Sequence, residues 1–455
     1  MNTKLLKQKI LDLAIRGKLV PQDPNDEPAS ELLKRIRAEK EKLIAEGKIK
    51  RSKKTGDKPH YENENVPFEI PESWEWVRLD EICDLKGGKR IPKGMTFADC
   101  PTPHIYIRVT DMKNNTILSN DIKYIDEQVY DEIKNYTIAD TDLYLTIAGT
   151  IGAVGQVPSL FNDMNLTENA AKLTNIKIDK AYLMYALLSS TAQEHFSSRF
   201  HQVAQPKLSI ETASSTYVPL PPSNEQSRIA KRIKEVFGLI DSVEVYKQDL
   251  QELVKQTKSK VLDLAIHGKL VPQDPNDELA VELLKRINPN ATICDTSHYG
   301  NLPTNWAVVN LLDLCKIDTG KWDANHAAIN GKYRFYTCST QYSYSDTKRF
   351  SGECIIIPGN GDIGNVFFYD GEFDAYQRTY VLSNIQIYPK YLYYHLLSNW
   401  RNINTDKQFG STIKFVRIGN FQNYIVMLPP IEEQKRIVSK IDELFSFFDS
   451  ILLEL

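Results

Sequence analysis

Residues 260–287 read KVLDLAIHGKLVPQDPNDELAVELLKRI, and residues 9–36 repeat this stretch with 24 of 28 positions identical. The segment before it, which starts with two prolines at 221–222, recurs near the C-terminus from 429–430. The second copy of the repeat is therefore split, with its end at the start of the chain and its beginning at the end. A cyclic repeat of this kind predicts a pseudo-two-fold fold whose chain termini lie close together.

The central copy has the pattern of one long helix. Ser223 and Gln226 fit a capping box at its start, and Gly268 is placed to end it in a left-handed conformation. At roughly 1.5 Å per residue, such a helix would be about 65 Å long. Its apolar residues keep one a/d register for about five heptads, interrupted by Lys247 and Thr257, which predicts a partner helix along one seam. They are Ile229, Ile233, Val236, Ile240, Val243, Leu250, Val254, Val261 and Leu264.

The split copy supplies that partner. Residues 431–455, continued across the chain break by residues 3–16, repeat the pattern of the central helix, and Gly17 ends the second part. We therefore predict an α+β fold, a pseudo-two-fold cyclic repeat in which two long antiparallel, coiled-coil helices separate two α/β domains. The alternative is an ordinary long core helix in a bundle, but the cyclic repeat argues against it.

The first copy alone extends into a basic stretch. Asp26 is placed to cap a short helix from Glu27 onward, and that helix runs into ten Lys and Arg residues between 34 and 54. A charge run of this kind is typical of a solvated face or a mobile connector. The alternative is that this stretch binds DNA phosphates without regard to sequence, which would make DNA binding depend strongly on salt concentration.

Two regions of unlike sequence lie between the repeated blocks. Each opens with a matching frame that contains Trp74 or Trp306, and these tryptophans are predicted to anchor each domain to the helices by packing. Beyond the frame the contents diverge, as expected if each domain presents a different surface to a different target. The predicted parts are an N-terminal helical segment, a first domain, a central helical spacer, a second domain and a distal helix, at 1–66, 67–222, 223–297, 298–430 and 431–455.

Alternating apolar residues predict strands inside both domains. Glycine turns are expected between strands, and a helix follows in each domain. The predicted strands are 105–109, 142–147, 353–357 and 365–369, the turns 148–152 and 359–364, and the helices 180–188 and 390–397.

Composition limits the class of protein. A net charge of -3 gives no global basic field to attract nucleic acid. The six cysteines form no CxxC pair, which argues against a zinc ribbon or a disulfide framework. The chain has neither a signal-peptide core at its start nor an apolar run of 18 residues. We therefore expect a cytoplasmic protein with no membrane partner.

The sequence shows no catalytic motif. Gly359, Gly361 and Gly364 match the dinucleotide fingerprint formally, but that motif needs a helix directly after it, whereas a strand pattern follows here. We interpret these glycines as a hairpin turn. There is no phosphate-binding loop of the GxxxxGK[S/T] kind, no [N/D]PP[Y/F] tetrapeptide, and no histidine pair at i, i+4. We expect no catalytic centre, no metal and no cofactor of its own.

Polar and basic loops remain as candidate DNA contacts. Arg suits the two acceptors of guanine and Gln or Asn the donor–acceptor pair of adenine, while Lys and Ser/Thr more often hold phosphate. The candidates in the first domain are Lys86, Lys89, Arg90, Arg108, Gln202, Gln205 and Lys207; those in the second are Lys321, Asn325, Asn360, Gln377, Arg378, Gln408, Ser411, Thr412 and Lys414.

The chain resembles the specificity (S) subunit of type I restriction-modification systems. The resemblance rests on the split repeat, the LDLAIxGKLVPQDP block, PESWEW before the first variable domain and LPPxxEQxxI after each. It implies two target-recognition domains that bind double-stranded DNA, two modification (methyltransferase) subunits bound to the chain, and restriction subunits that join for cleavage. S-adenosylmethionine, ATP and Mg would be used by those partners.

Under this hypothesis each domain reads one half-site, and the helices set the separation of the half-sites. Two domains on a common face would read positions about one DNA turn apart, on the order of 34–36 Å. One competing class is a stand-alone nucleotide-binding or DNA-cleaving enzyme, which would turn over substrate without other subunits. Another is a protein-only coiled-coil adaptor, which would bind no DNA.

Overall fold

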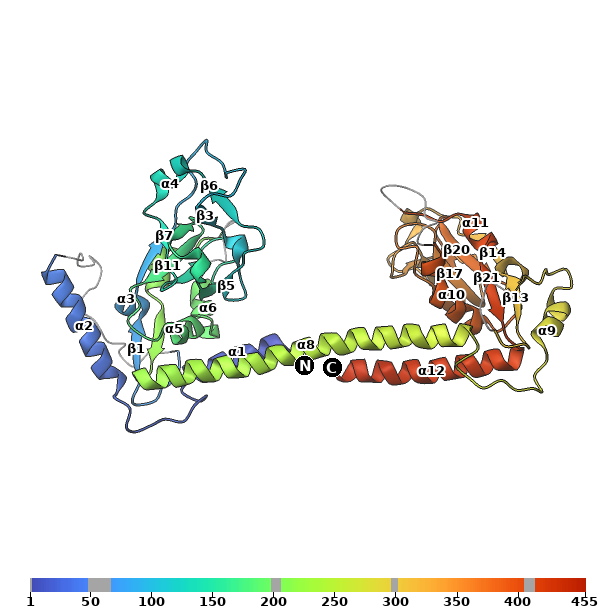
Figure 1. The fold of residues 1–455 in the computed structure, drawn as a ribbon, viewed down its shortest axis with the longest axis horizontal. Coiled ribbons are helices and arrows are strands. Elements are labelled where there is room, and N and C mark those ends of the chain that lie inside the picture. The colour runs from blue at the N-terminus through green and yellow to red at the C-terminus, as the bar shows by residue number, and fades with distance from the viewer. Residues whose placement is uncertain (1, 48–66, 198–205, 296–301, 405–413) are drawn as a thin grey trace. The chain divides into compact units, whose positions relative to one another are not determined.

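The computed structural model describes residues 2–47, 67–197, 206–295, 302–404 and 414–455. The chain forms two compact units, Met1–Val245 and Tyr246–Leu455 (Figure 1). Each unit combines a domain of strands and short helices with part of one long helix, α8, Ser223–Ile266. The fold is α+β with this helix between two domains, as predicted. The finer domain boundaries given above stay predictions.

Helix α8 runs for 44 residues and confirms the predicted long helix. Gly268 ends it as predicted, because its φ of +68° is left-handed and the amide of Lys269 donates back into the last helical turn. A side chain here would also be crowded, since Pro303 Cγ lies 2.4 Å from the position of an added Cβ. Gly17 ends α1 (Thr3–Ile15) in the same conformation, with a φ of +67°.

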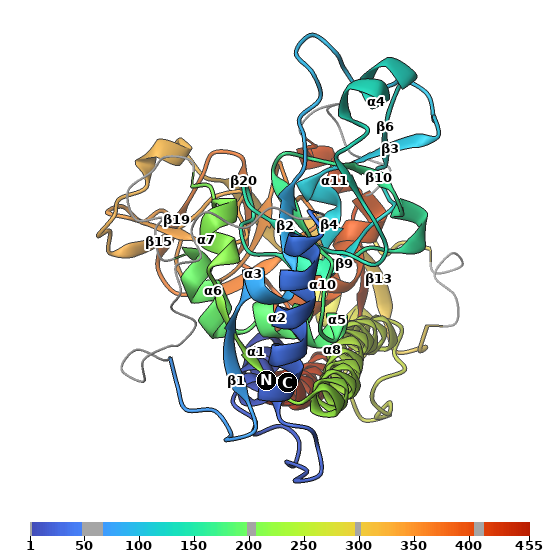
Figure 2. The same cartoon turned by 90° about the vertical axis from the view of Figure 1, so that its left-hand side faces the viewer.

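In the first unit, α1 packs antiparallel on its part of α8 (Figures 1 and 2). Thr3 Oγ1 donates to Glu244 Oε2 over 3.0 Å, and Lys7 pairs with Asp241. The order of these contacts shows that the two helices run in opposite directions. The N-terminal part of the split copy therefore pairs with the central copy, as predicted.

In the second unit, α12 (Ile431–Glu454) packs antiparallel on the rest of α8. Lys258 pairs with Asp449 at 2.6 Å, and Lys247 Nζ donates to the Leu455 carbonyl over 2.8 Å. The C-terminal part of the split copy thus has the predicted partner too. The predicted end-to-end placement of the two chain termini stays a prediction.

The predicted seam of α8 is partly wrong. Ile233 and Ile240 in the first unit and Val254 in the second are buried as predicted, but the side chain of Val243 is 44% exposed. The reason is that α1 contacts the polar residues Asp241 and Glu244 of α8. The face of α8 that meets α1 therefore contains these two residues in place of Val243.

The predicted capping box at the start of α8 is also wrong. The side chain of Gln226 donates to the Pro221 carbonyl over 2.8 Å and accepts from the Asp179 amide over 2.9 Å, so it does not bond back to Ser223. Gln434 makes the equivalent pair of bonds in the second unit, to Pro429 and from Tyr388. Each glutamine therefore joins its helix to the neighbouring domain.

The predicted tryptophan anchors are confirmed as contacts between domain and helix. Trp74 Nε1 donates to Glu225 Oε2 over 2.9 Å, and Trp306 Nε1 donates to Glu433 Oε2 over 3.1 Å. Both tryptophans are buried. Burial raises the pKa of Glu225 and of Glu433, and the indole and glutamine donors around each carboxylate oppose that rise.

Asp26 does not cap a helix, which corrects the prediction. Its carboxylate binds Arg228 at 2.6 Å, and α2 (Ala29–Ala45) begins later, after Pro28. The hydrogen bond from Arg228 is the main cause that holds the pKa of Asp26 below its usual value. Asp277 and Arg436 repeat this ion pair at 2.6 Å in the second unit. Asp26 thus binds a residue far away in the sequence and does not cap the nearby helix, although its spacing had predicted that it would.

The first domain closes where the chain enters and leaves it, because β1 (Glu75–Arg78) pairs antiparallel with β12 (Tyr217–Leu220). Two four-stranded sheets follow, of orders β2-β11-β8-β9 and β6-β3-β10-β7. Their strands are β2 Asp84–Gly87, β3 His104–Ile107, β6 Lys123–Ile125, β7 Thr137–Ile138, β8 Leu143–Thr146, β9 Val154–Gln156, β10 Met164–Leu166 and β11 Ala170–Thr174; β4 Met112–Lys113 and β5 Thr116–Ile117 form a separate pair. Its helices are α3 Leu79–Ile82, α4 Glu127–Ile133, α5 Lys180–Leu187, α6 Ser190–Ser197 and α7 Ile210–Ser214.

The second domain has the same closing pair, β13 (Ala307–Asn310) with β21 (Ile425–Leu428). Its central sheet has the order β14-β20-β17-β18, and a second sheet the order β16-β15-β19. The remaining bounds are α9 Ala280–Ile287, β14 Lys316–Thr319, β15 Tyr333–Tyr336, β16 Ser343–Ser345, β17 Glu353–Pro358, β18 Phe367–Asp370, β19 Phe373–Ala375, β20 Thr379–Ser383, α10 Pro389–Asn404 and α11 Ile418–Gln422. The predicted strands and helices in both domains are present, and β18 follows the 359–364 turn, which confirms a hairpin there.

A buried hydrogen-bond network in the second domain predicts a pH-dependent stability. His395 is fully buried, its Nε2 accepts from the Met427 amide over 3.2 Å, and its Nδ1 lies 3.0 Å from the Tyr424 hydroxyl. Loss of solvation is the main cause that lowers the pKa of His395 to about 3.

Because this pKa lies below the ordinary value, the unfolded chain takes up the proton more readily. The contribution of neutral His395 is complete above about pH 6.5 and is lost as the pH falls towards 3. We expect the free energy of unfolding of this unit to fall by about 1.4 kcal/mol per pH unit between roughly 6 and 4 from this group. Urea unfolding of the wild type and of His395→Gln checks this, since equal pH slopes would contradict it.

No helix in the part of the chain that the structure describes is both long and apolar enough to cross a membrane.

Candidate nucleic-acid interface

One end of each central sheet gathers most of the predicted contact residues. In the second domain, the pairing registers bring together the end of β14, the start of β20, the end of β17 and the start of β18. In the first domain the same holds for β2, β11, β8 and β9. We call this edge the loop end of each central sheet. The loops that leave it come from distant parts of the sequence.

Backbone hydrogen bonds tie the loops of the second domain to one another. The Gly359 amide donates to the Arg378 carbonyl over 2.8 Å, the Gly361 amide to Lys414 over 3.0 Å, and the Gln377 amide to Trp322 over 2.9 Å. Lys321 precedes Trp322 directly, and Asn360 forms a bridge with Phe415. The structure therefore brings Lys321, Asn360, Gln377, Arg378 and Lys414 to one loop end.

Most of these side chains are exposed. Lys321, Gln377, Arg378 and Lys414 are exposed and Asn360 is partly buried. Asn325, also exposed, lies in the short helix η4 (Ala324–His326), whose His326 stacks on Trp322 with ring centroids 4.3 Å apart. This end of the domain thus offers amide and cationic donors to a partner.

In the first domain, fewer of the candidate contact residues meet at the loop end. The Gly88 amide donates to Ala170 over 3.0 Å and the Lys89 amide to Leu166 over 2.8 Å, while Lys207 bridges to Ala148. Lys86, Lys89, Arg90 and Lys207 are all exposed near this loop end. Their role in DNA binding stays a prediction.

The guanidinium of Arg108 is held by two carboxylates of its own domain. It donates to Asp111 over 2.7 Å and to Asp121 over 3.1 Å. Any contact of Arg108 with DNA would compete with these two carboxylates. The candidates Gln202, Gln205, Gln408, Ser411 and Thr412 lie outside the described residues.

The sequence reasoning missed a pair of residues in the first domain. The Ile147 amide donates to the Asn169 carbonyl over 2.8 Å, as the Gly359 amide does to Arg378. Glu168 and Asn169 therefore hold the position that Gln377 and Arg378 hold in the second domain. The signal was available, because Leu173-Thr174-Asn175 and Leu382-Ser383-Asn384 end the two strands alike, and both asparagines have positive φ.

The Glu168 carboxylate is charged and already accepts hydrogen bonds from within its own domain. Burial raises its pKa, but hydrogen bonds from Arg90 and from Thr167 outweigh this and hold the pKa of Glu168 below its usual value. The bond from Arg90 Nε measures 2.7 Å, and the Arg90 side chain is 78% exposed. An ion pair whose basic side chain is open to solvent adds little to stability, so Arg90 can leave Glu168 when a partner binds.

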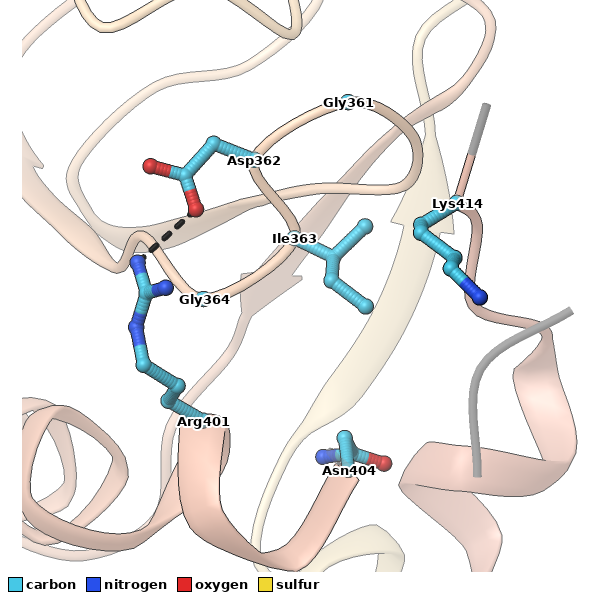
Figure 3. A pocket seen from close by; sticks show the side chains of 7 residues that line it. All are labelled: Gly361, Asp362, Ile363, Gly364, Arg401, Asn404 and Lys414. Atoms are coloured by element: carbon cyan, nitrogen blue, oxygen red, sulfur yellow. Dashed lines mark hydrogen bonds and ion pairs between the residues drawn. The ribbon is translucent and has the colours of Figure 1, made fainter. Parts of the chain in front are cut away.

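A small pocket of about 150 Å³ lies beside the loop end of the second domain (Figure 3). Arg401 donates to Asp362 over 2.8 Å, and the buried Asn404 accepts from Asn420 over 2.7 Å, whereas Lys414 points away from Asp362. Because Arg401 holds Asp362 of the glycine turn, we assign this pocket to the support of that turn.

No group of three His, Cys, Asp or Glu side chains that could hold a metal ion is present among the described residues. The free cysteines Cys83, Cys315 and Cys354 are buried, and burial raises the pKa of the Cys354 thiol to about 11.

Comparison with known proteins places the chain in a family. Residues 71–252 and 303–452 each match the family described as "Type I restriction modification DNA specificity domain". The chain belongs to this family, and the two matches confirm the family predicted from the sequence and its two-fold organisation.

Two relatives show how far the similarity extends. The chain is 32% identical over 332 residues to the EcoAI specificity subunit of Escherichia coli, covering 62% of this chain and 55% of that protein. It is 31% identical over 346 residues to the EcoEI specificity subunit of Escherichia coli, covering 62% and 54%. The chain thus aligns with about half the length of these relatives. Both are named as specificity subunits of restriction enzymes, in agreement with the prediction of a non-catalytic recognition chain.

A solved structure shares the fold. It is described as the structural basis of complex assembly and conformational transition of the type I R-M system, and its chain matches with a TM-score of 0.58 at 15% identity, covering 85% of this chain and 94% of that one. At this identity the likeness supports the fold alone.

Proposed function

We propose that this chain is the DNA sequence-specificity subunit of a type I restriction-modification complex, and that it reads a bipartite, asymmetric target. One observation carries the proposal: two domains with the same sheet frame present different side chains at equivalent places. The first offers Glu168 and Asn169 and the second Gln377 and Arg378. A frame that is kept while its loops change fits two readers of two different half-sites.

The residue types suit base edges in the major groove. Gln and Asn pair with the N6 and N7 atoms of adenine, Arg with the O6 and N7 atoms of guanine, and Glu accepts from the N4 amine of cytosine. Lys321 and Lys414, next to the second pair, suit phosphate. This division gives each domain a means of choosing bases and a means of holding the backbone.

Helix α8 would dock the partner subunits. Large apolar side chains are exposed along it, Leu239 to 66% and Val243 to 44% in the first unit, and Tyr246 to 70% and Leu253 to 57% in the second. Exposed apolar residues repeated along a helix are typical of helix-to-helix contacts. We propose that two modification subunits bind here, one for each repeat, and that restriction subunits join them.

Chemistry would belong to those partners. S-adenosylmethionine, ATP and Mg would be bound and used by them, and this chain would contribute the choice of site. We place the assembly in the cytoplasm, in contact with the DNA that it reads.

Reconstitution tests this function. The chain with its modification subunits is expected to methylate plasmid DNA at defined sites, whereas the chain alone, given S-adenosylmethionine, ATP and Mg, is expected to show no turnover. If the isolated chain turns over substrate, and this activity elutes with the chain in size-exclusion chromatography, the stand-alone enzyme is favoured. A reconstituted complex that binds no DNA would favour the adaptor.

A further inference from the structure

Arg334 lies on β15, and its guanidinium packs against two tyrosine rings. Its Cζ atom is 4.3 Å from the ring centroid of Tyr342 and 4.3 Å from that of Tyr369. One terminal nitrogen donates to the Tyr336 hydroxyl over 3.4 Å. The three tyrosines come from β15, from the segment before β16 and from β18, so the fold fixes the position of this guanidinium.

Arg334 has no acidic partner in the described part of the chain, and its side chain is only partly buried. Two other arginines of the domains differ in this respect, because Arg90 pairs with Glu168, and Arg401 with Asp362. A cation that is held by aromatic faces and lacks a counter-charge keeps donors available for a ligand.

The surroundings of Arg334 place it next to the proposed DNA-reading loops. It lines a cavity of about 310 Å³ together with Ser339, Thr340 and Gln341. The chain after β15 reaches Cys338, whose Sγ lies 3.5 Å from the Arg378 carbonyl. The cavity that Arg334 lines therefore reaches the start of β18 at the loop end of the second domain, where Gln377 and Arg378 also lie.

We propose that Arg334 reads a guanine in the half-site that the second domain recognises. A planar guanidinium offers parallel donors that match the O6 and N7 acceptors of guanine. A phosphate offers a similar acceptor pair, but it can be approached from many directions and needs no fixed position of the guanidinium. The tyrosine contacts fix that position, which favours the base edge. This inference rests on the proposed function, because it needs the domain to face DNA.

The test uses the complete complex and determines which sites it methylates. Arg334→Lys keeps the charge but loses the paired donors, so preference for guanine at one position is expected to fall about 10- to 100-fold while binding to random DNA is kept. Arg334→Gln is expected to move the preference at that position towards adenine. Tyr342→Phe keeps the ring face and is expected to leave the preference unchanged.

Arg349→Lys is the matched control. Arg349 is exposed in the same domain and packs against the single ring of Phe350 at 5.5 Å, and its variant is expected to keep the full motif. The melting temperature of each variant separates a specific effect from loss of folding.

Three outcomes would overturn the inference. The first is an unchanged motif in both Arg334 variants. The second is a uniform loss of affinity on all sequences, which indicates a phosphate contact. The third is a lowered melting temperature with the motif intact, which indicates a packing role. If the wild-type complex itself shows no two-part target, the proposed function fails, and this inference fails with it. A two-part target in the wild type with unchanged variants removes only the role of Arg334.

Discussion

Replacing Arg378 with alanine is expected to relax base choice in one half of the target while the other half is read as before. Arg378 is exposed, and its carbonyl is held by Gly359 at the loop end of the second domain. Loss of a paired contact to a base costs about 1–3 kcal/mol, which corresponds to roughly 5- to 150-fold in discrimination. Asn169→Ala is the matched change in the first domain, and we expect it to relax the opposite half.

The measurement is the frequency of each base in the modified sites of the wild type and the two variants. Lys414→Ala serves as a control for backbone contacts, because loss of a phosphate contact should weaken binding to all sequences and reduce its salt dependence. Equal relaxation of both halves by Arg378→Ala would contradict the assignment of one half-site to each domain.

Insertion of one heptad into α8 is expected to lengthen the unread gap between the half-sites by about three base pairs. Seven residues add about 10.5 Å to a helix, and DNA rises about 3.4 Å per base pair. Because seven residues rotate an α-helix by only about 20° from two full turns, the side chains beyond the insertion keep nearly the same direction. The best position is 248–251, the four residues that have no counterpart in the split copy.

A two-residue insertion at the same place is the control. It turns the following part of the helix by about 200°, so it should remove methylation of any two-part target although it adds little length. If the heptad insertion left the gap unchanged, the separation of the half-sites would have another origin, and α8 would not act as a ruler.

The helical framework could be predicted because the repeat carries it. Identical blocks with Gly17 and Gly268 at equivalent places defined where helices end, and the repeated tryptophans defined the joints. Local rules failed where a long-range partner competed. Asp26 binds Arg228 instead of capping a helix, and Gln226 bonds to the domain instead of closing a capping box. Neither partner can be found from spacing alone.

The candidate interface was predictable only in part, for the same reason. Gln377 and Arg378 stand out in the sequence as a base-reading pair, and the loops do gather there. Their counterpart Asn169 has no basic neighbour in sequence, so it can be located only by aligning the matching strand ends Leu173-Thr174-Asn175 and Leu382-Ser383-Asn384. Arg334 was missed because its significance comes from Tyr342 and Tyr369, which belong to other strands or loops.

The most direct measurement is a genome-wide map of methylated bases in cells that carry this chain with its modification subunits. Two recognition domains of different loop chemistry on a spacer of fixed length require one motif with two different specified blocks, separated by a constant number of unspecified positions. That is the result we predict. A single contiguous motif, or two identical blocks in inverted order, would contradict it.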